Sequence, residues 1–263
     1  MMKKFFYSIS TLIFLMVFFI SCGDKDTPEE SRQQIIFHFD CYVADQELKC
    51  DTLMYVNAAG NQYMVNEIQY FISDVTLHRA DSSAYVISAW KDIHYVDSDI
   101  PSTQTWEVYD NIPVGDYNGI SFTFGISSEK NHSYMFSDPP ERDMFWPDYL
   151  GGGYHYMKLN GKWLNPQGQL SPFDFHLGIG QVYASYPDSI IAFIDNSFEV
   201  ELPNSNFQVK ENTIKEFHLL MNIDEWFTNP LNFDFNYYGG SIMQNQEAMD
   251  VGCQNGWNVF SLE

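Results

Sequence analysis

The sequence predicts an all-β protein, a single antiparallel β-sandwich of the immunoglobulin-like or jelly-roll-like kind. Apolar and polar residues alternate within short segments, and turn residues recur roughly every ten residues. Beyond the first residues, no long segment has the 3.6-residue apolar period of a helix. Hydrophobic residues make up 45% of the 263 residues and aromatic residues 17%, which is ample for a large core.

The N-terminus has the pattern of an export signal. Lys3 and Lys4 precede an apolar run, 5–20, which is short for a membrane-spanning helix. Ser21 and Cys22 end a segment that resembles a bacterial lipobox, so we expect a lipid on Cys22. An ordinary secreted protein, cut before Cys22, is the alternative.

These signals divide the chain into a signal peptide (1–21), an acidic tether (22–32) and one sandwich domain (33–263). The tether resembles that of surface-exported Bacteroidetes lipoproteins. We therefore expect an outer-membrane lipoprotein that is held by its lipid and faces the periplasm or the cell surface.

The charge excludes one class of partner. The formal net charge is -22, whereas nucleic-acid binding needs a basic surface. An acidic surface mainly keeps a protein soluble, and it also attracts cations.

Strand patterns follow one another along the sandwich domain. In the first, Ile35, Phe37 and Phe39 alternate with His38 and Asp40, which therefore share the other face. Turn residues at 60–61, 81–83 and 112–117 separate later strands. We expect strands at 33–43, 53–57, 63–65, 68–79, 85–87, 94–96, 119–126, 153–159, 173–179, 190–200, 213–223 and 231–235.

Two segments depart from this pattern. The stretch 127–153 is polar, aromatic and without a period, and it ends in three glycines, so we expect a long functional loop there. The stretch 225–227 is expected to form a short helical turn capped by Asp224.

Several segments together resemble the MbnP-like family of periplasmic β-sandwich proteins. The matching pieces keep the family's order and lie between Phe37 and Phe260. They are IQYFISDVTL (68–77), IPVGDY (112–117), FTFGI (122–126), MFW (144–146), GY (153–154), KLNG (158–161) and FHLG (175–178).

The resemblance implies copper binding, in some members after a di-haem partner enzyme has oxidised a tryptophan to kynurenine. By position, His176 matches the family's histidine before Leu-Gly, His38 matches a first-strand histidine, and Trp146 matches the loop tryptophan. Asp148 stands where the family motif has a second tryptophan, which puts the oxidation of Trp146 in question.

The strand pattern gives an independent interpretation of the histidines. His176 shares a face with Asp174, a pairing that suits an imidazole ligand oriented by a carboxylate. His218 shares its face with Glu216. His155 shares its face with apolar residues, which favours a hydrogen-bonded core histidine. The metal candidates are thus His38 and His176, followed by His155 and His218, with copper or alternatively zinc as the ion.

Three cysteines follow Cys22. Cys41 and Cys50 flank an acidic segment that can fold back as a hairpin, so a disulfide between them is expected in an oxidising compartment. Pairing of Cys253 with either one is the alternative.

The motifs of common enzyme classes do not occur in the sequence: it has no G-x-S-x-G, no phosphate-binding loop and no H-E-x-x-H. We therefore expect a non-enzymatic, metal-binding accessory or sequestration protein. The alternatives are an adhesin-like module and a surface glycan-binding module that uses Trp90, Trp106, Trp146 and Trp163 as stacking platforms.

Overall fold

The computed structural model describes residues 33–89 and 91–263. The expected signal peptide, Cys22, the acidic tether and Trp90 lie outside the described residues. Within the described part of the chain, no helix is long and apolar enough to cross a membrane.

The first sheet joins the two ends of the domain. Its strands run in the order β16-β15-β1-β2. Strand β7 also pairs with β1, along the edge that faces away from β15. They are β1 (Gln34–Val43), β2 (Gln46–Glu47), β7 (Thr105–Glu107), β15 (Ile214–Asn222) and β16 (Phe260–Leu262).

The second sheet is built around the long strand β4. Its order is β10-β9-β4-β8-β13, and shorter strands pair with β4 and β8. Its strands are β3 (Tyr55–Val56), β4 (Gln62–Arg79), β5 (Ala84–Val86), β6 (Ile93–Asp97), β8 (Gly115–Phe124), β9 (Met157–Leu164), β10 (Leu170–Leu177), β13 (Phe198–Leu202) and β14 (Phe207–Val209).

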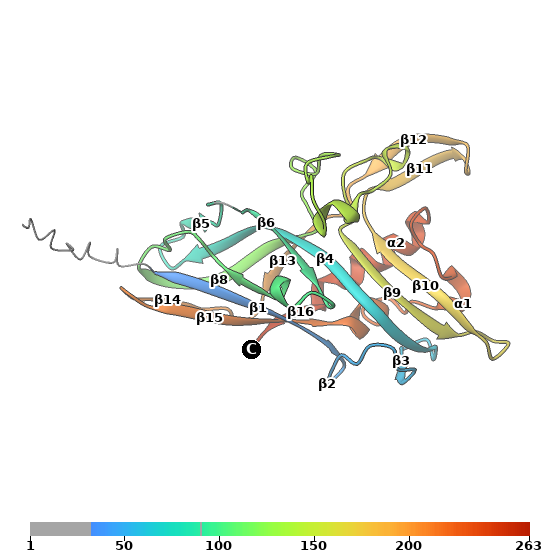
Figure 1. Cartoon of the computed structure of the whole chain (residues 1–263), viewed down its shortest axis with the longest axis horizontal. Coiled ribbons are helices and arrows are strands. Elements are labelled where there is room, and N and C mark those ends of the chain that lie inside the picture. The colour runs from blue at the N-terminus through green and yellow to red at the C-terminus, as the bar shows by residue number, and fades with distance from the viewer. Residues whose placement is uncertain (1–32, 90) are drawn as a thin grey trace, which may run out of the picture. The chain divides into compact units, whose positions relative to one another are not determined.

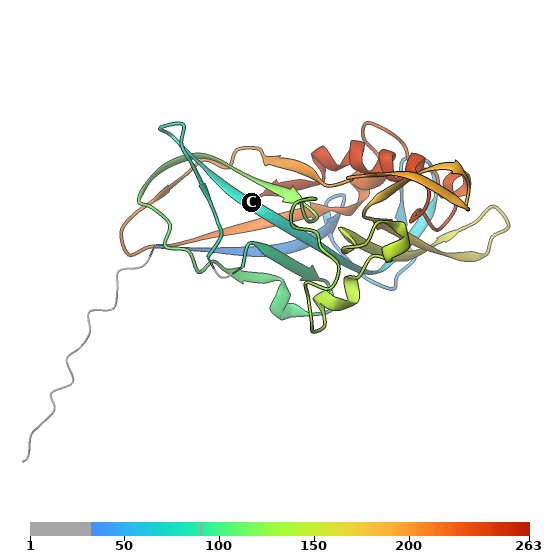
Figure 2. The ribbon, with the colours of Figure 1, turned by 90° about the horizontal axis from the view of Figure 1, so that it is seen from above.

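The core lies between these two sheets, and Figures 1 and 2 show β1 and β15 beside β4 and β8. Residues from both inner faces, such as Phe37 and Leu219 on one and Ile72 and Phe122 on the other, belong to one buried cluster. Burial of apolar side chains on two facing sheets is what holds a sandwich together.

A hairpin and two helices complete the end of the domain that carries β9 and β10 (Figure 1). The hairpin is β11 (Gly180–Ser185) with β12 (Ser189–Ile194), and the helices are α1 (Phe235–Tyr238) and α2 (Gln246–Asn255). Helix α2 approaches β10 closely, because a Cβ on Gly252 would lie 2.8 Å from the Phe175 ring. Short 3-10 helices occur at Pro101–Thr103, Glu141–Met144, Asp148–Leu150, Ile223–Phe227 and Gly256–Asn258.

The predicted all-β sandwich is confirmed, with one exception to its antiparallel pairing. Strands β1 and β15 are parallel neighbours, so His38 lies beside His218. Parallel neighbours need a long crossover, and here most of the domain separates the two strands.

Several local expectations were wrong, and the expected strands 63–65 and 68–79 are one continuous strand, β4. The stretch 190–200 is two strands, because the Asp195 side chain accepts hydrogen bonds from Ser197 and turns the chain. The stretch 231–235 is no strand but leads into α1, whose first turn Asp234 caps. Asn222, rather than Asp224, caps the turn at Ile223–Phe227.

Candidate metal site

Two histidines meet at the end of the β9–β10 pair. His176 is on β10, directly opposite Lys158 on β9, and His155 lies two residues before β9 begins. Their ring centroids are 5.1 Å apart and the rings are nearly perpendicular. The expected strand 153–159 begins only at Met157, since the preceding residues bond to the loop: the backbone N–H of His155 donates to the Met144 carbonyl.

Hydrogen bonds assign the tautomer of each histidine. Nδ1 of His155 lies 2.9 Å from the Met144 carbonyl oxygen, which can only accept, so Nδ1 carries the proton. Nε2 of His176 lies 2.8 Å from Oδ1 of Asn160, whose amide nitrogen donates to Glu67. His176 is therefore protonated on Nε2. This leaves Nε2 of His155 and Nδ1 of His176 as lone-pair donors, the form in which imidazole binds a metal.

Burial keeps both rings neutral. It lowers the pKa of His155 to about 3, helped by the neighbouring His176 and by Lys158. It lowers the pKa of His176 to about 4, and again Lys158 adds to the shift. The two nitrogens are thus free of protons near neutral pH, so a metal ion would not have to displace a proton there.

Trp146 covers His155. Its side chain is fully buried, and its ring meets the His155 ring edge to face with centroids 4.6 Å apart. Its indole Nε1 donates to the Leu150 carbonyl at 3.1 Å. On the other side, a Cβ on Gly178 would lie 2.6 Å from the indole, so only glycine allows this approach. The FHLG segment (175–178), which resembles the family motif, therefore supplies both His176 and Gly178, the glycine against which Trp146 packs.

The loop around Trp146 is held by side chains of its own. Asp148 accepts hydrogen bonds from Ser133 at 2.7 Å and from Tyr134 at 2.6 Å, and these bonds lower the pKa of its carboxyl. Ser133 Oγ in turn accepts from the backbone N–H of Gly153. Asp148 thus fastens the loop at the position where the family motif has a second tryptophan.

The other two histidine candidates lie on a different sheet. His38 and His218 stack with ring centroids 4.7 Å apart, on adjacent strands whose inward residues form the core. His38 pairs with Glu216 at 3.2 Å and His218 with Asp40 at 3.1 Å. The structure therefore joins His176 with His155 and Trp146, and it joins His38 with His218, so the expected set of His38 with His176 is not brought together.

The donor set at His155 and His176 fits an ion of low coordination number. The ring centroids are 5.1 Å apart and each ring keeps one nitrogen lone pair, so two imidazole ligands are available in this part of the fold. Among the described residues, no group of three or more His, Cys, Asp or Glu side chains is arranged to hold a metal. Lys158 places a positive charge nearby, and burial lowers its pKa, while Glu67 and Asp143 oppose that shift.

The MbnP family model matches residues 32–247, a range that includes Trp146, His155 and His176. The chain belongs to the MbnP family. The solved structure of MbnP from Methylosinus trichosporium is similar in fold, with a TM-score of 0.51 and 17% identity over 77% of this chain and 80% of that chain. No curated protein sequence matches.

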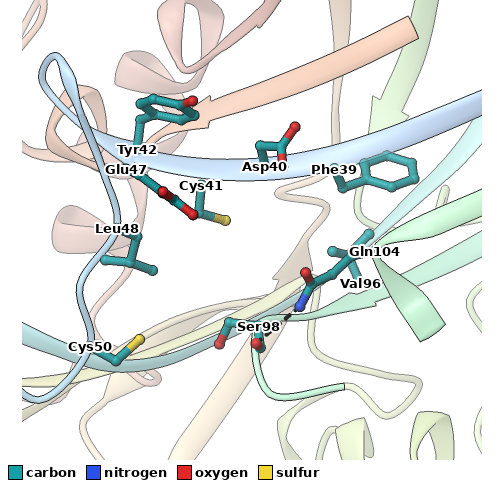
Figure 3. Close-up of a pocket in the computed structure, with 10 residues that line it drawn as sticks. All are labelled: Phe39, Asp40, Cys41, Tyr42, Glu47, Leu48, Cys50, Val96, Ser98 and Gln104. Atoms are coloured by element: carbon teal, nitrogen blue, oxygen red, sulfur yellow. Dashed lines mark hydrogen bonds between the residues drawn. The ribbon is translucent and has the colours of Figure 1, made fainter. Parts of the chain in front are cut away.

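Among the described residues of this MbnP-family domain, Cys41, Cys50 and Cys253 are not joined by a disulfide in the structure. Figure 3 shows the Cys41 and Cys50 sulfur atoms at the walls of one pocket, of about 170 Å³. Burial raises the pKa of Cys41 to about 12 and also raises that of Cys50, so both are protonated and weakly nucleophilic. Their disulfide remains a prediction.

The tryptophans proposed as glycan platforms are core residues in this fold. Trp106 is 5% exposed and stacks on His94, and Trp163 is 8% exposed and stacks on Phe235. Trp146 is the buried ring over His155. Large rings gain more from burial than from exposure, so these three offer no stacking surface.

Sequence reasoning missed the residues that orient the histidines. His176 was expected to be oriented by Asp174, but its partner is Asn160 on the neighbouring strand. His155 is a hydrogen-bonded core histidine, as the sequence predicts. It is also the neighbour of His176, which the sequence does not predict. The KLNG motif at 158–161 could have identified Lys158 and Asn160 as neighbours of His176. Both residues share the face of His176 when β9 pairs with β10.

Proposed function

We propose that this MbnP-family protein binds copper through His155 and His176 beneath Trp146, as a non-catalytic accessory or sequestration protein. The supporting observation is the pair of neutral imidazoles, each with one nitrogen held by an uncharged acceptor and the other left as a lone-pair donor. The ion would be stored or handed on rather than used for turnover.

Copper suits the donors better than zinc. Structural zinc sites are closed by four protein ligands, and catalytic ones have three. In the described residues this pair has no third histidine, cysteine or carboxylate arranged with it. Imidazole is a good copper ligand, and a nearby ammonium group is less unfavourable for a singly charged ion than for a doubly charged one.

The proposal includes oxidation of Trp146 by a partner oxidase, for which a di-haem enzyme is the candidate. The indole is packed against His155, so a change in that ring alters the immediate surroundings of the metal. Because Trp146 is fully buried, a diffusing oxidant does not reach it directly. A dedicated partner accounts for selective oxidation at such a position.

Copper titration tests the site. Protein from the native host is titrated with Cu(I) and Cu(II), and wild type is compared with His176→Ala and His155→Ala. We expect one ion per chain in wild type and loss of at least tenfold in affinity in each variant. His38→Ala and His218→Ala are matched controls and should bind like wild type. Absence of copper binding by the host-expressed protein, or equal losses in the controls, would refute the site.

Peptide mass mapping of the same samples tests the modification. An oxygen-dependent mass gain on the peptide that carries Trp146 supports it. An unmodified peptide from protein that binds copper fully would show that the ion needs only the histidines.

We further propose that Cys22 carries a lipid that anchors the chain to the outer membrane, at its periplasmic or cell-surface side. Metabolic labelling with a radioactive fatty acid should mark wild type and leave Cys22→Ser unlabelled. Protease treatment of intact cells separates the two sides, since only a surface-exposed chain is cleaved.

A further inference from the structure

A cavity of about 550 Å³ lies between the β11–β12 hairpin and the segment that leads into α2. Gln181, Tyr183 and Tyr186 line it from the hairpin, and Gln244 and Asn245 line it from the other side. Its lining residues are all uncharged, although the chain has a formal net charge of -22. The volume falls within the usual range for small-molecule sites, about 300–1,000 Å³.

The side-chain oxygen of Gln181 lacks a hydrogen-bond donor. The residue is 3% exposed, and its amide nitrogen donates to the carbonyls of Leu150 and Ile179. These bonds fix the orientation of the amide, and its oxygen is buried without a hydrogen-bond partner. An unpaired buried acceptor is unfavourable, so a ligand whose O–H group reaches this oxygen after a small movement of the amide is stabilised.

The tyrosines supply a flat surface and further polar atoms. Tyr186 is 66% exposed and meets Tyr183 edge to face, with ring centroids 5.1 Å apart. The Tyr183 hydroxyl donates to Oε1 of Gln244 at 3.0 Å. Gln244 therefore keeps its amide N–H groups, and Tyr183 keeps its oxygen lone pairs, for a ligand.

We propose that this cavity binds a neutral sugar, as one or two pyranose units. The apolar face of the ring would lie on Tyr186, while hydroxyl groups donate to the Gln181 oxygen and accept from Gln244. An anionic sugar would find no cation in the lining of an acidic protein, and a cation would find no carboxylate there. The cavity contains neither His155 nor His176, so this proposal does not depend on copper binding.

Titration with sugars of known structure tests the proposal. The full-length chain is titrated with glucose, galactose, mannose, N-acetylglucosamine, maltose and cellobiose, and the Gln181 side-chain amide is followed by ¹H–¹⁵N NMR. A ligand of this size in an open site is expected to have a Kd of about 1 mM. We expect at least one of these sugars to shift the Gln181 signal in a saturable way.

Two surface variants and one control locate the site. Tyr186→Ala and Gln244→Ala should each weaken binding by tenfold or more. Tyr237→Ala removes a tyrosine that is equally exposed, at 70%, but lies on α1 outside the cavity, and it should bind like wild type. The proposal is overturned if no sugar of the panel shifts the Gln181 amide, or if Tyr237→Ala weakens binding as much as Tyr186→Ala.

Discussion

His155, which packs against Trp146, has its ring centroid 5.1 Å from that of His176, whereas His38 and His218 lie on the other sheet with centroids 4.7 Å apart. The first pair is largely buried and its partners are a backbone carbonyl and an amide. The second pair is partly exposed, and each of its rings faces a carboxylate.

Proximity of two imidazole rings therefore does not by itself define a metal site. Each ring of the exposed pair already has a carboxylate partner, and water competes for its exposed nitrogens. A buried ring held by an uncharged acceptor stays neutral and keeps one orientation.

Acid should destabilise the metal-free protein through the buried pair. The folded-state pKa of His155, about 3, lies below the usual value of 6.5, so the unfolded state binds more protons between these values. Stability is therefore greatest above pH 6.5 and falls as the pH drops toward 3, by on the order of 4 kcal/mol for this residue. Urea unfolding across this range should show a flatter profile for His155→Gln than for wild type, and an equally steep profile in the variant would contradict the prediction.

Gly178→Ala should destabilise the fold by about 1–3 kcal/mol, because the new methyl group overlaps the indole of Trp146. Urea unfolding measures the loss, and Trp fluorescence reports the displaced ring. Gly119→Ala is the control, since its Cβ would make only ordinary contacts, 3.6 Å or longer. Equal losses in the two variants would contradict the close packing of Trp146.

Asn160→Leu should weaken copper binding by about 10–100-fold, as loss of the group that orients a metal-bound histidine usually does. The substitution removes the acceptor that holds Nε2 of His176. Glu216→Gln changes the equivalent partner of His38 and should leave the copper affinity unaltered. Copper competition with a chelator of known affinity measures both.

Lys158→Met should tighten copper binding by a few-fold, because it removes a positive charge that acts on both buried histidines. Lys162→Met removes the same charge four residues further along β9, on the same face, and should have a smaller effect. The same chelator competition at low salt distinguishes them, and a loss of affinity in Lys158→Met would mean that the lysine supports the site.

The sequence was sufficient to predict most of the sandwich, because its signals are local. Alternation identified β1, β4, β10 and β15, and glycine-containing turns separated the strands. Helix α2 escaped detection because small residues such as Ala248 and Gly252 weaken its apolar period, and because only its contact with β10 defines the buried face. The pairing of β1 with β15 depends on the whole fold and has no local signal.

The site was predictable only in part, for the same reason. His176 and Trp146 stand in recognisable motifs, and their proximity follows from the fold of the loop. The partner of His176 was not predictable, since Asn160 comes into reach through the β9–β10 register. His38 matched by position in the chain and yet lies on the other sheet.

The pairing of β1 with β15 has a consequence for how the protein is made. His38 and Glu216, which touch across these strands, are 178 residues apart in the chain. A ribosome releases the chain from its N-terminus, so the apolar row Ile35, Phe37 and Phe39 is synthesised long before β15, its parallel partner strand. Until then β1 has only the short strands β2 and β7 as early partners, so we expect the pairing of β1 with β15 to be a late step in folding.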